Sequence, residues 1–255
     1  MDVKKLLKAV EENVINGKYS EAYRLLINSN FVMHSKIEEA EYNFWMGICL
    51  FERHDYRASI QSFEKIVNSS TQKDLQINLH ILYYELSLSY FSLYEVERIK
   101  SHLSRALEYC KKSLDYEINN SIITESTGLM IYSEESPKAY IDTLIHLGVL
   151  YQALQEYEKS LEILRVSKAI CQHYSLLMLL GKVYDEIGTT YMQMDEGERA
   201  EYYFKKSLVV KSCIKNERGI NITIQKAIML TLRHPELMNK DITQRLDRMI
   251  REERV

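Results

Sequence analysis

Few residues in this sequence have the types and spacing that catalysis or metal binding requires. None of the seven histidines pairs at a metal-ligand spacing such as HExxH. Ser70 and Lys73 satisfy the S-x-x-K spacing, but they lie in the polar stretch SSTQKD, where nothing desolvates the lysine. A glycine-rich phosphate loop and a nucleophile elbow are both missing from the sequence. We therefore expect no catalytic residue, no metal ion and no cofactor.

The cysteines also argue against a metal site. They form no CxxC pair and are spread along the chain, at Cys49, Cys110, Cys171 and Cys213. Such spacing is typical of reduced thiols that are buried as small hydrophobic residues.

Composition and charge narrow the classes of protein further. The chain has 2 prolines and 8 glycines in 255 residues, which favours long helices joined by short connections. A net charge of −3 and a pI near 6.2 argue against a surface built mainly to bind nucleic acid. The N-terminus, MDVKKLLKAVEENV, is charged and unlike a signal peptide, and no apolar run approaches the ~20 residues that cross a bilayer. We expect a cytoplasmic protein that contacts neither membrane nor nucleic acid.

The elements that would position any binding site repeat along the chain. Segments such as AEYNFWMGICLFERHDYRASIQSFEKIV and YIDTLIHLGVLYQALQEYEKSLEILRVSK align with one another, and their apolar residues follow helical spacing. Each copy has a small or slim residue in its first helix, which allows the second helix to cross closely: Val10, Gly47, Ser87, Gly148 and Gly188. The second helices carry the apolar residues Leu26, Phe63, Leu103, Leu164 and Phe204. The pattern predicts an all-α fold of about five to six antiparallel helix pairs in one domain, residues 1–255.

Two regions depart from the regular spacing. Ser87 and Gly148 are separated by 21 residues more than the other neighbouring copies, which places an insertion at about 114–137. We expect its first residues to extend the preceding helix and then form a loop, with Ser136 and Pro137 starting the next helix. The insertion is either a simple loop or a lid that contacts a partner. Beyond the last copy, residues 217–252 are expected to form capping helices, interrupted at Pro235.

These copies resemble the tetratricopeptide repeat, most closely in MGICLFERHDYRASIQSFEKIV and LGVLYQALQEYEKSLEILRVSK. The resemblance covers essentially the whole chain and implies a right-handed superhelix. The 40-residue period and the segment YDEIGTTYMQMDEGERAEYYFKKSL are similar to the repeat domains of Gram-positive peptide-pheromone receptors. These are the Rap, NprR, PlcR and Rgg group, and the layout is closest to the PlcR type. This second resemblance implies quorum sensing and transcription regulation through a short peptide held on the concave face, and a possible homodimer.

In such a superhelix the first helix of each pair lines the concave side. The N-terminal half of this face is predicted to be aromatic and apolar, with Phe44, Trp45, Ile48, Phe51, Tyr84, Glu85 and Leu88. The C-terminal half is predicted to be polar and acidic, with His146, Gln152, Asp185, Glu186, Gln193 and Gln225. An extended peptide with one hydrophobic end and one polar or basic end would match both halves. Alternatively, the aromatic side chains pack on one another or on the insertion, and Trp45 belongs to the core between repeats.

Three functions remain open at this point. The first is a non-catalytic domain that senses a short signalling peptide and is part of, or related to, a transcriptional regulator. The second is a scaffold that binds a folded partner protein or itself, although Phe44, Tyr84 and Glu85 exclude the version that clamps a C-terminal carboxylate. The third is an enzyme, which turnover of a phosphorylated response regulator would reveal.

Overall fold

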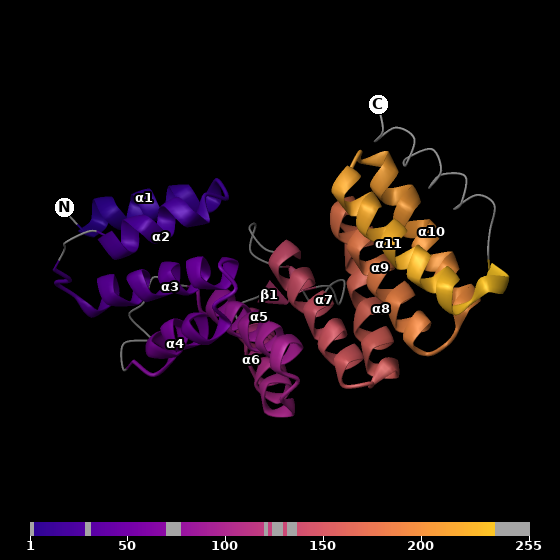
Figure 1. Cartoon of the computed structure of the whole chain (residues 1–255), viewed down its shortest axis with the longest axis horizontal. Coiled ribbons are helices and arrows are strands. Elements are labelled where there is room, and N and C mark those ends of the chain that lie inside the picture. The colour runs from indigo at the N-terminus through magenta and orange to yellow at the C-terminus, as the bar shows by residue number, and fades with distance from the viewer. Residues whose placement is uncertain are drawn as a thin grey trace. The chain divides into compact units, whose positions relative to one another are not determined.

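Consecutive helices pack as antiparallel pairs in the computed structural model (Figure 1). It describes residues 3–28, 32–69, 78–119, 122–123, 130–131 and 137–237. Ser70, Lys73, Ser136, much of the predicted insertion and the last part of the predicted capping helices lie outside these residues. The chain divides into two compact units, Met1–Asn120 and Ser121–Val255, with the division inside the predicted insertion. The single domain over 1–255 therefore stays a prediction.

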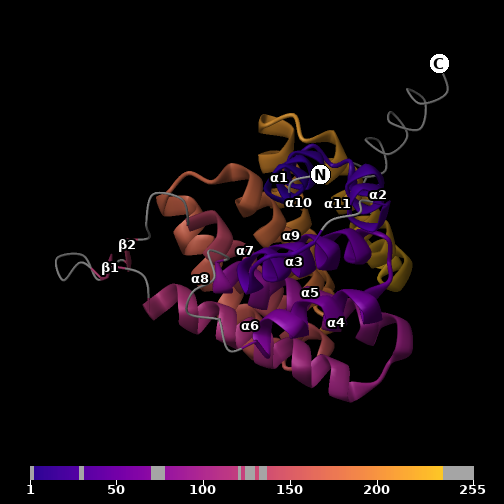
Figure 2. The ribbon, with the colours of Figure 1, turned by 90° about the vertical axis from the view of Figure 1, so that its left-hand side faces the viewer.

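The first unit contains three helix pairs in its described residues. Their bounds are α1 (Val3–Ile15), α2 (Tyr19–Asn28), α3 (Lys36–Glu52), α4 (Tyr56–Val67), α5 (Leu79–Glu97) and α6 (Lys100–Asn119). Figure 2 shows α3, α4, α5 and α6 side by side, and each packs against the next one in the chain. Helix α6 runs on to Asn119, which confirms that the start of the predicted insertion extends the preceding helix.

The second unit begins with a feature that the sequence did not predict. Two short strands, β1 (Ile122–Ile123) and β2 (Met130–Ile131), pair in antiparallel register, with Ile122 opposite Ile131. The remaining elements are α7 (Pro137–Ala153), α8 (Tyr157–His173), α9 (Leu177–Gln193), α10 (Gly197–Cys213), α11 (Glu217–Arg233) and the 3₁₀ turn η2 (Pro235–Leu237). Pro137 is the first residue of α7, as predicted. The all-α class is confirmed, because the strand pair covers only four residues.

Small residues lie where the paired helices cross, as predicted. A Cβ atom on Gly47 would lie 2.5 Å from Cε1 of Phe63, and one on Gly188 would lie 2.7 Å from Cε1 of Phe204. At the equivalent crossing in α7 and α8, a Cβ on Gly148 would lie 2.9 Å from the Leu164 side chain. The predicted apolar residue of the second helix therefore fills the space that the glycine leaves open.

The turns within several helix pairs share one backbone conformation. His54, Gln155 and Asp195 have φ values of 63°, 62° and 63°, in the left-handed region. The amide of the following residue bonds back to the helix, as Asp55 N does to the Leu50 carbonyl at 2.9 Å. This is the hydrogen-bond pattern of a Schellman motif, in which glycine is the usual left-handed residue. The same short turn thus sets the pairing of α3 with α4, α7 with α8, and α9 with α10.

The core and the cysteines follow the prediction with one exception. Phe63, Leu86, Leu164 and Phe204 are completely buried between helices. Among the cysteines, Cys213 is exposed and corrects the expectation that all four thiols are buried. No described helix combines the length and the apolar composition that a bilayer-spanning segment needs.

Candidate functional site

The first unit has a hollow of about 700 Å³ across the inner helices α1, α3 and α5. We call it the first-unit hollow; it is lined by Lys4, Leu7, Lys8, Glu11, Glu41, Phe44, Trp45, Asn78 and Ile81. Two of the predicted binding residues, Phe44 and Trp45, contribute to it. The α1 residues, Glu41, Asn78 and Ile81 were missed. A repeat signal for Leu7 was available, because Leu7 precedes Val10 by three residues, as Phe44 precedes Gly47.

The floor of the hollow is apolar and held in place by aromatic contacts. Phe44 is only 9% exposed, and its ring meets that of Trp45 edge-on, with centroids 5.1 Å apart. Phe44 also contacts the core ring of Phe63 at 6.0 Å. Leu7 is buried, whereas Ile81 is 41% exposed and offers its side chain to a ligand. This arrangement can accept an apolar side chain without rearrangement of the core.

Charge at the rim of the hollow is balanced. Lys4 and Lys8 lie on the α1 side, together with Glu11, and Glu41 lies on α3. Burial raises the pKa of Glu41, and the carboxylates of Glu11 and Glu38 raise it further. The rim is therefore not selective for one sign of charge. A smaller hollow of about 300 Å³ between α3 and α4 has mainly polar walls, with Ala40 and Ile66 as its apolar side chains.

The other predicted residues of the first unit are half-buried along the same inner helices. Ile48 and Phe51 lie on α3, with the ring of Phe51 packed 5.5 Å from that of Tyr56. Tyr84, Glu85 and Leu88 lie on α5. Burial raises the pKa of Glu85 to about 7, and the nearby charge of Glu52 contributes to this rise.

In the second unit the predicted residues divide into buried and exposed sets. His146, Gln152 and Asp185 are buried, Glu186 is half-buried, and Gln193 and Gln225 are exposed. Gln152 Nε2 donates to the Glu186 carbonyl at 3.0 Å and to Thr190 Oγ1 at 2.9 Å. The Gln152 amide, predicted to line the polar half of the concave face, therefore ties α7 to α9.

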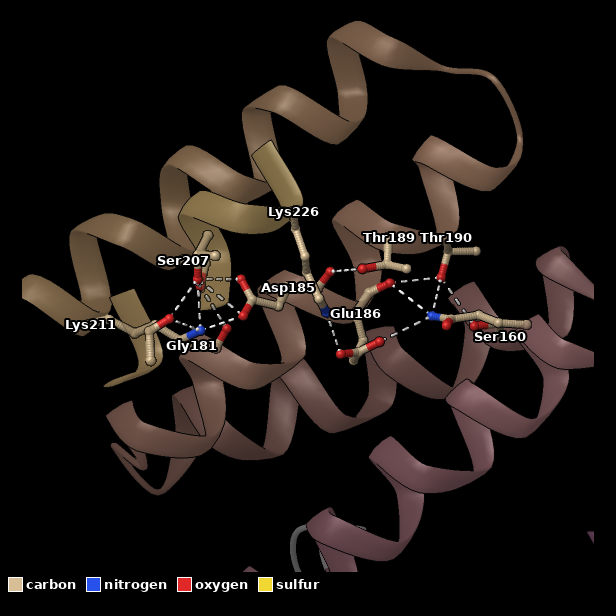
Figure 3. A network of polar contacts seen from close by, with 12 residues as sticks. Ser160, Gly181, Asp185, Glu186, Thr189, Thr190, Ser207, Lys211 and Lys226 are labelled. Atoms are coloured by element: carbon tan, nitrogen blue, oxygen red, sulfur yellow. Dashed lines mark hydrogen bonds and ion pairs between the residues drawn. The ribbon is translucent and has the colours of Figure 1, made fainter. Parts of the chain in front are cut away.

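Asp185 belongs to a buried polar cluster between α9, α10 and α11 (Figure 3). It forms an ion pair with Lys211, and the two side chains are 5% and 3% exposed. Thr223 Oγ1 lies 2.8 Å from Asp185 Oδ1 and 2.8 Å from Lys211 Nζ. Lys211 also donates to the Gly219 carbonyl at 3.2 Å. The carboxylate of Asp185 is thus paired and hydrogen-bonded within the protein. The sequence does not reveal this, because it does not show that Lys211 reaches Asp185 from another helix.

Two ion pairs link equivalent positions of successive inner helices. Lys182 on α9 bonds to Asp142 on α7 at 3.1 Å, and Lys226 on α11 bonds to Glu186 on α9 at 2.7 Å. Each pair joins residues 40 positions apart, which is the repeat period. We call these two ion pairs the charge ladder. The carboxylates expected to make this inner face acidic are therefore each matched by a lysine.

The Ser113 hydroxyl and the thiols of Cys49 and Cys110 are buried, whereas the Cys213 thiol is exposed. The Ser113 hydroxyl lies 2.9 Å from His80 Nδ1, but both side chains are enclosed between α5 and α6. Burial raises the pKa of Cys49 to about 11 and that of Cys110 to about 12, which keeps both thiols protonated near neutral pH. Within the described ranges, no cluster of three or more His, Cys, Asp or Glu residues could hold a metal ion.

Comparison with known proteins identifies the fold. No protein-family model matches the chain, and no curated protein matches it. The structure is similar to TTC0263, a tetratricopeptide protein of Thermus thermophilus, at 16% identity and a TM-score of 0.60, over 89% of this chain and 99% of that one. It is also similar to a signal-transduction ATPase of Pyrococcus horikoshii with a tetratricopeptide repeat sensor, at 16% identity and a TM-score of 0.67, over 93% and 36%.

A third similar structure is a Rap protein in complex with Competence and Sporulation Factor. Its identity is 12% and its TM-score 0.64, over 98% of this chain and 74% of that one. The chain therefore has an all-α, tetratricopeptide-like fold.

Proposed function

We propose that the chain is a non-catalytic regulatory domain that binds a short signalling peptide on the inner face of its first unit. The observation that carries the proposal is the first-unit hollow, about 700 Å³ in volume, with an apolar floor of Leu7, Phe44, Trp45 and Ile81. A hollow of this size and lining suits one or two apolar side chains of an extended segment. The predicted residues Ile48, Tyr84 and Leu88 would extend the contact along α3 and α5.

The signalling role rests on the likeness of fold to the Rap protein, whose structure contains Competence and Sporulation Factor. By analogy, we propose quorum sensing as the process and a transcriptional regulator as the setting, in the cytoplasm. A homodimer is part of the same proposal, as is the absence of direct contact with nucleic acid.

Trp45 makes the test direct, because it is the only tryptophan of the chain and it lines the hollow. We would titrate the protein with pools of acetylated, amidated pentapeptides and follow the tryptophan emission. A pool with leucine or phenylalanine at its centre should shift the emission to shorter wavelength as the indole loses water. A serine-centred pool should not.

The matched variants are Ile81→Gln and Val96→Gln, both on α5. Val96 is 70% exposed and does not line the hollow, so its replacement should leave binding unchanged. Ile81→Gln should weaken binding roughly 5-fold, because an apolar contact worth about 1 kcal/mol is lost. Failure of every apolar pool to shift the emission would refute the proposal.

A scaffold for a folded partner is the second candidate, and exposed apolar residues on α11 favour it. Ile222, Met229 and Leu232 are exposed in the described part of the second unit, Leu232 at 77%. Analytical ultracentrifugation of Leu232→Gln against the parent chain tests self-association through this face. Loss of a dimer in the variant, with peptide binding to the first-unit hollow also absent, would favour the scaffold, because the dimer alone fits both candidates.

A further inference from the structure

The carboxylates on the inner faces of the two units differ in whether they form an ion pair with a lysine. In the second unit, Asp142, Asp185 and Glu186 each form an ion pair with a lysine. In the first unit, Glu85 on α5 is half-buried and Glu52 at the end of α3 is exposed. The ion pairs among the described residues of this unit include neither of them. An inner face that leaves a half-buried carboxylate without a cation can take that cation from a ligand.

Glu85, Glu52 and Tyr19 lie within range of one another's charges. Burial raises the pKa of Tyr19, and the charges of Glu52 and Glu85 raise it further. Burial likewise raises the pKa of Glu85 to about 7, with Glu52 as the second cause, and no described lysine or arginine offsets either effect. These carboxylates therefore repel each other, and a positive charge placed between them would relieve the repulsion.

Glu85 lies one helical turn beyond the first-unit hollow. Ile81 lines the hollow, and Glu85 follows it by four residues on the same face of α5. Four residues of α-helix advance about 6 Å along the axis. In an extended peptide, residues i and i+2 point to the same side and lie about 7 Å apart. The two spacings match, so an extended peptide can place one side chain in the hollow and the next but one beside Glu85.

We propose that the first unit recognises an extended peptide in which an apolar side chain fills the hollow and a lysine or arginine two residues away pairs with Glu85 and Glu52. This inference rests on the proposed peptide-binding function and specifies its ligand. The balanced rim of the hollow does not select the charge of the peptide. The selection comes from Glu85 and Glu52, which form no ion pair with the residues that the structure describes.

The test uses three acetylated, amidated pentapeptides and the emission of Trp45. They are Ala-Leu-Ala-Lys-Ala, the same peptide with norleucine in place of lysine, and Ala-Leu-Lys-Ala-Ala. The first should bind about 10-fold more tightly than either of the others. In the second the charge is missing, and in the third it points to the opposite side of the strand.

Two variants on α5 separate the contact from general charge. Glu85→Gln should remove the 10-fold preference, so that the lysine and norleucine peptides bind equally. Glu95→Gln deletes the same charge from an exposed residue of the same helix and should retain the preference. Equal loss of the preference in both variants would show that only the net charge matters and would overturn the proposal.

The pH dependence of the unmodified chain gives a second test that requires no variant to fold. The lysine peptide should bind more weakly at pH 6 than at pH 8, because Glu85 is ionised above about 7 and protonated below. Tyr19 stays neutral in this range, since burial raises its pKa further from the range tested, and the peptide lysine stays charged. The affinity of the norleucine peptide should not change.

The outcomes distinguish this inference from the function on which it rests. Equal binding of the lysine and norleucine peptides, with both sensitive to Ile81→Gln, overturns the preference for a cation and leaves peptide binding intact. Absence of any emission change with all three peptides and with the pools overturns both.

Discussion

The buried ion pair of Asp185 and Lys211 gives the sharpest prediction about stability. Both side chains are at least 95% buried, and Lys211 comes from α10 while Asp185 comes from α9. Lys211→Met keeps most of the aliphatic volume but leaves the carboxylate without its cation. Breaking a buried pair in this way costs about 3–5 kcal/mol of unfolding free energy. This is a large fraction of the roughly 5–15 kcal/mol that stabilises a typical domain.

The double variant Asp185→Leu, Lys211→Met decides whether the cost comes from the orphaned charge. Without both charges the desolvation cost disappears, and Thr223 keeps its bond to the Gly219 carbonyl at 3.0 Å. We expect the double variant to recover most of the lost stability. Urea unfolding followed by circular dichroism measures all forms. Lys182→Met is the control, because its pair with Asp142 is half-exposed and should contribute less than about 1 kcal/mol. A double variant no more stable than Lys211→Met would refute the reasoning.

Three further predictions concern the crossings, the turns and the titration of the first unit. Gly47→Ala should lower the midpoint of thermal unfolding, because the added Cβ would meet the rigid ring of Phe63. Overpacking of this kind lowers the free energy of unfolding by about 1–3 kcal/mol. An unchanged midpoint would contradict the close crossing of α3 and α4. Gln155→Gly should be neutral or stabilising by up to about 1 kcal/mol in urea, because φ is 62° there. Glu85→Gln should gain urea resistance relative to the parent chain between pH 5 and pH 8. The raised pKa of Glu85, about 7, favours the fold at low pH, and this contribution is lost as the pH rises through that value.

The fold could be predicted from the sequence because close crossings restrict the residue type at a few fixed positions. Gly47, Gly148 and Gly188 recur with a large apolar partner in the next helix, and the structure confirms those pairs. The left-handed turns could not be predicted in the same way. His54 and Asp195 occupy the position where glycine is usual, so the residue type gives only a weak signal of the backbone conformation.

The candidate site was only partly accessible to sequence reasoning. Phe44 and Trp45 were predicted from their offset to the small residue, and the same offset in the first copy pointed to Leu7. The burial of Asp185 was not predicted, because a carboxylate on an inner position looks the same whether or not a lysine from another helix reaches it. The charge ladder did have a signal, since Lys182 follows Asp142 by one repeat period.

The charge ladder also gives the copies of the second unit a fixed order. Lys182 faces an aspartate in the preceding inner helix, and Glu186 faces a lysine in the following one. If the segment containing α9 and α10 were duplicated in tandem, the two copies of Lys182 would become neighbours, and so would the two copies of Glu186. Like charges would then stand side by side at both positions. Growth of this protein by internal duplication would therefore require compensating charge reversals, although the backbone pattern of the repeats would allow it.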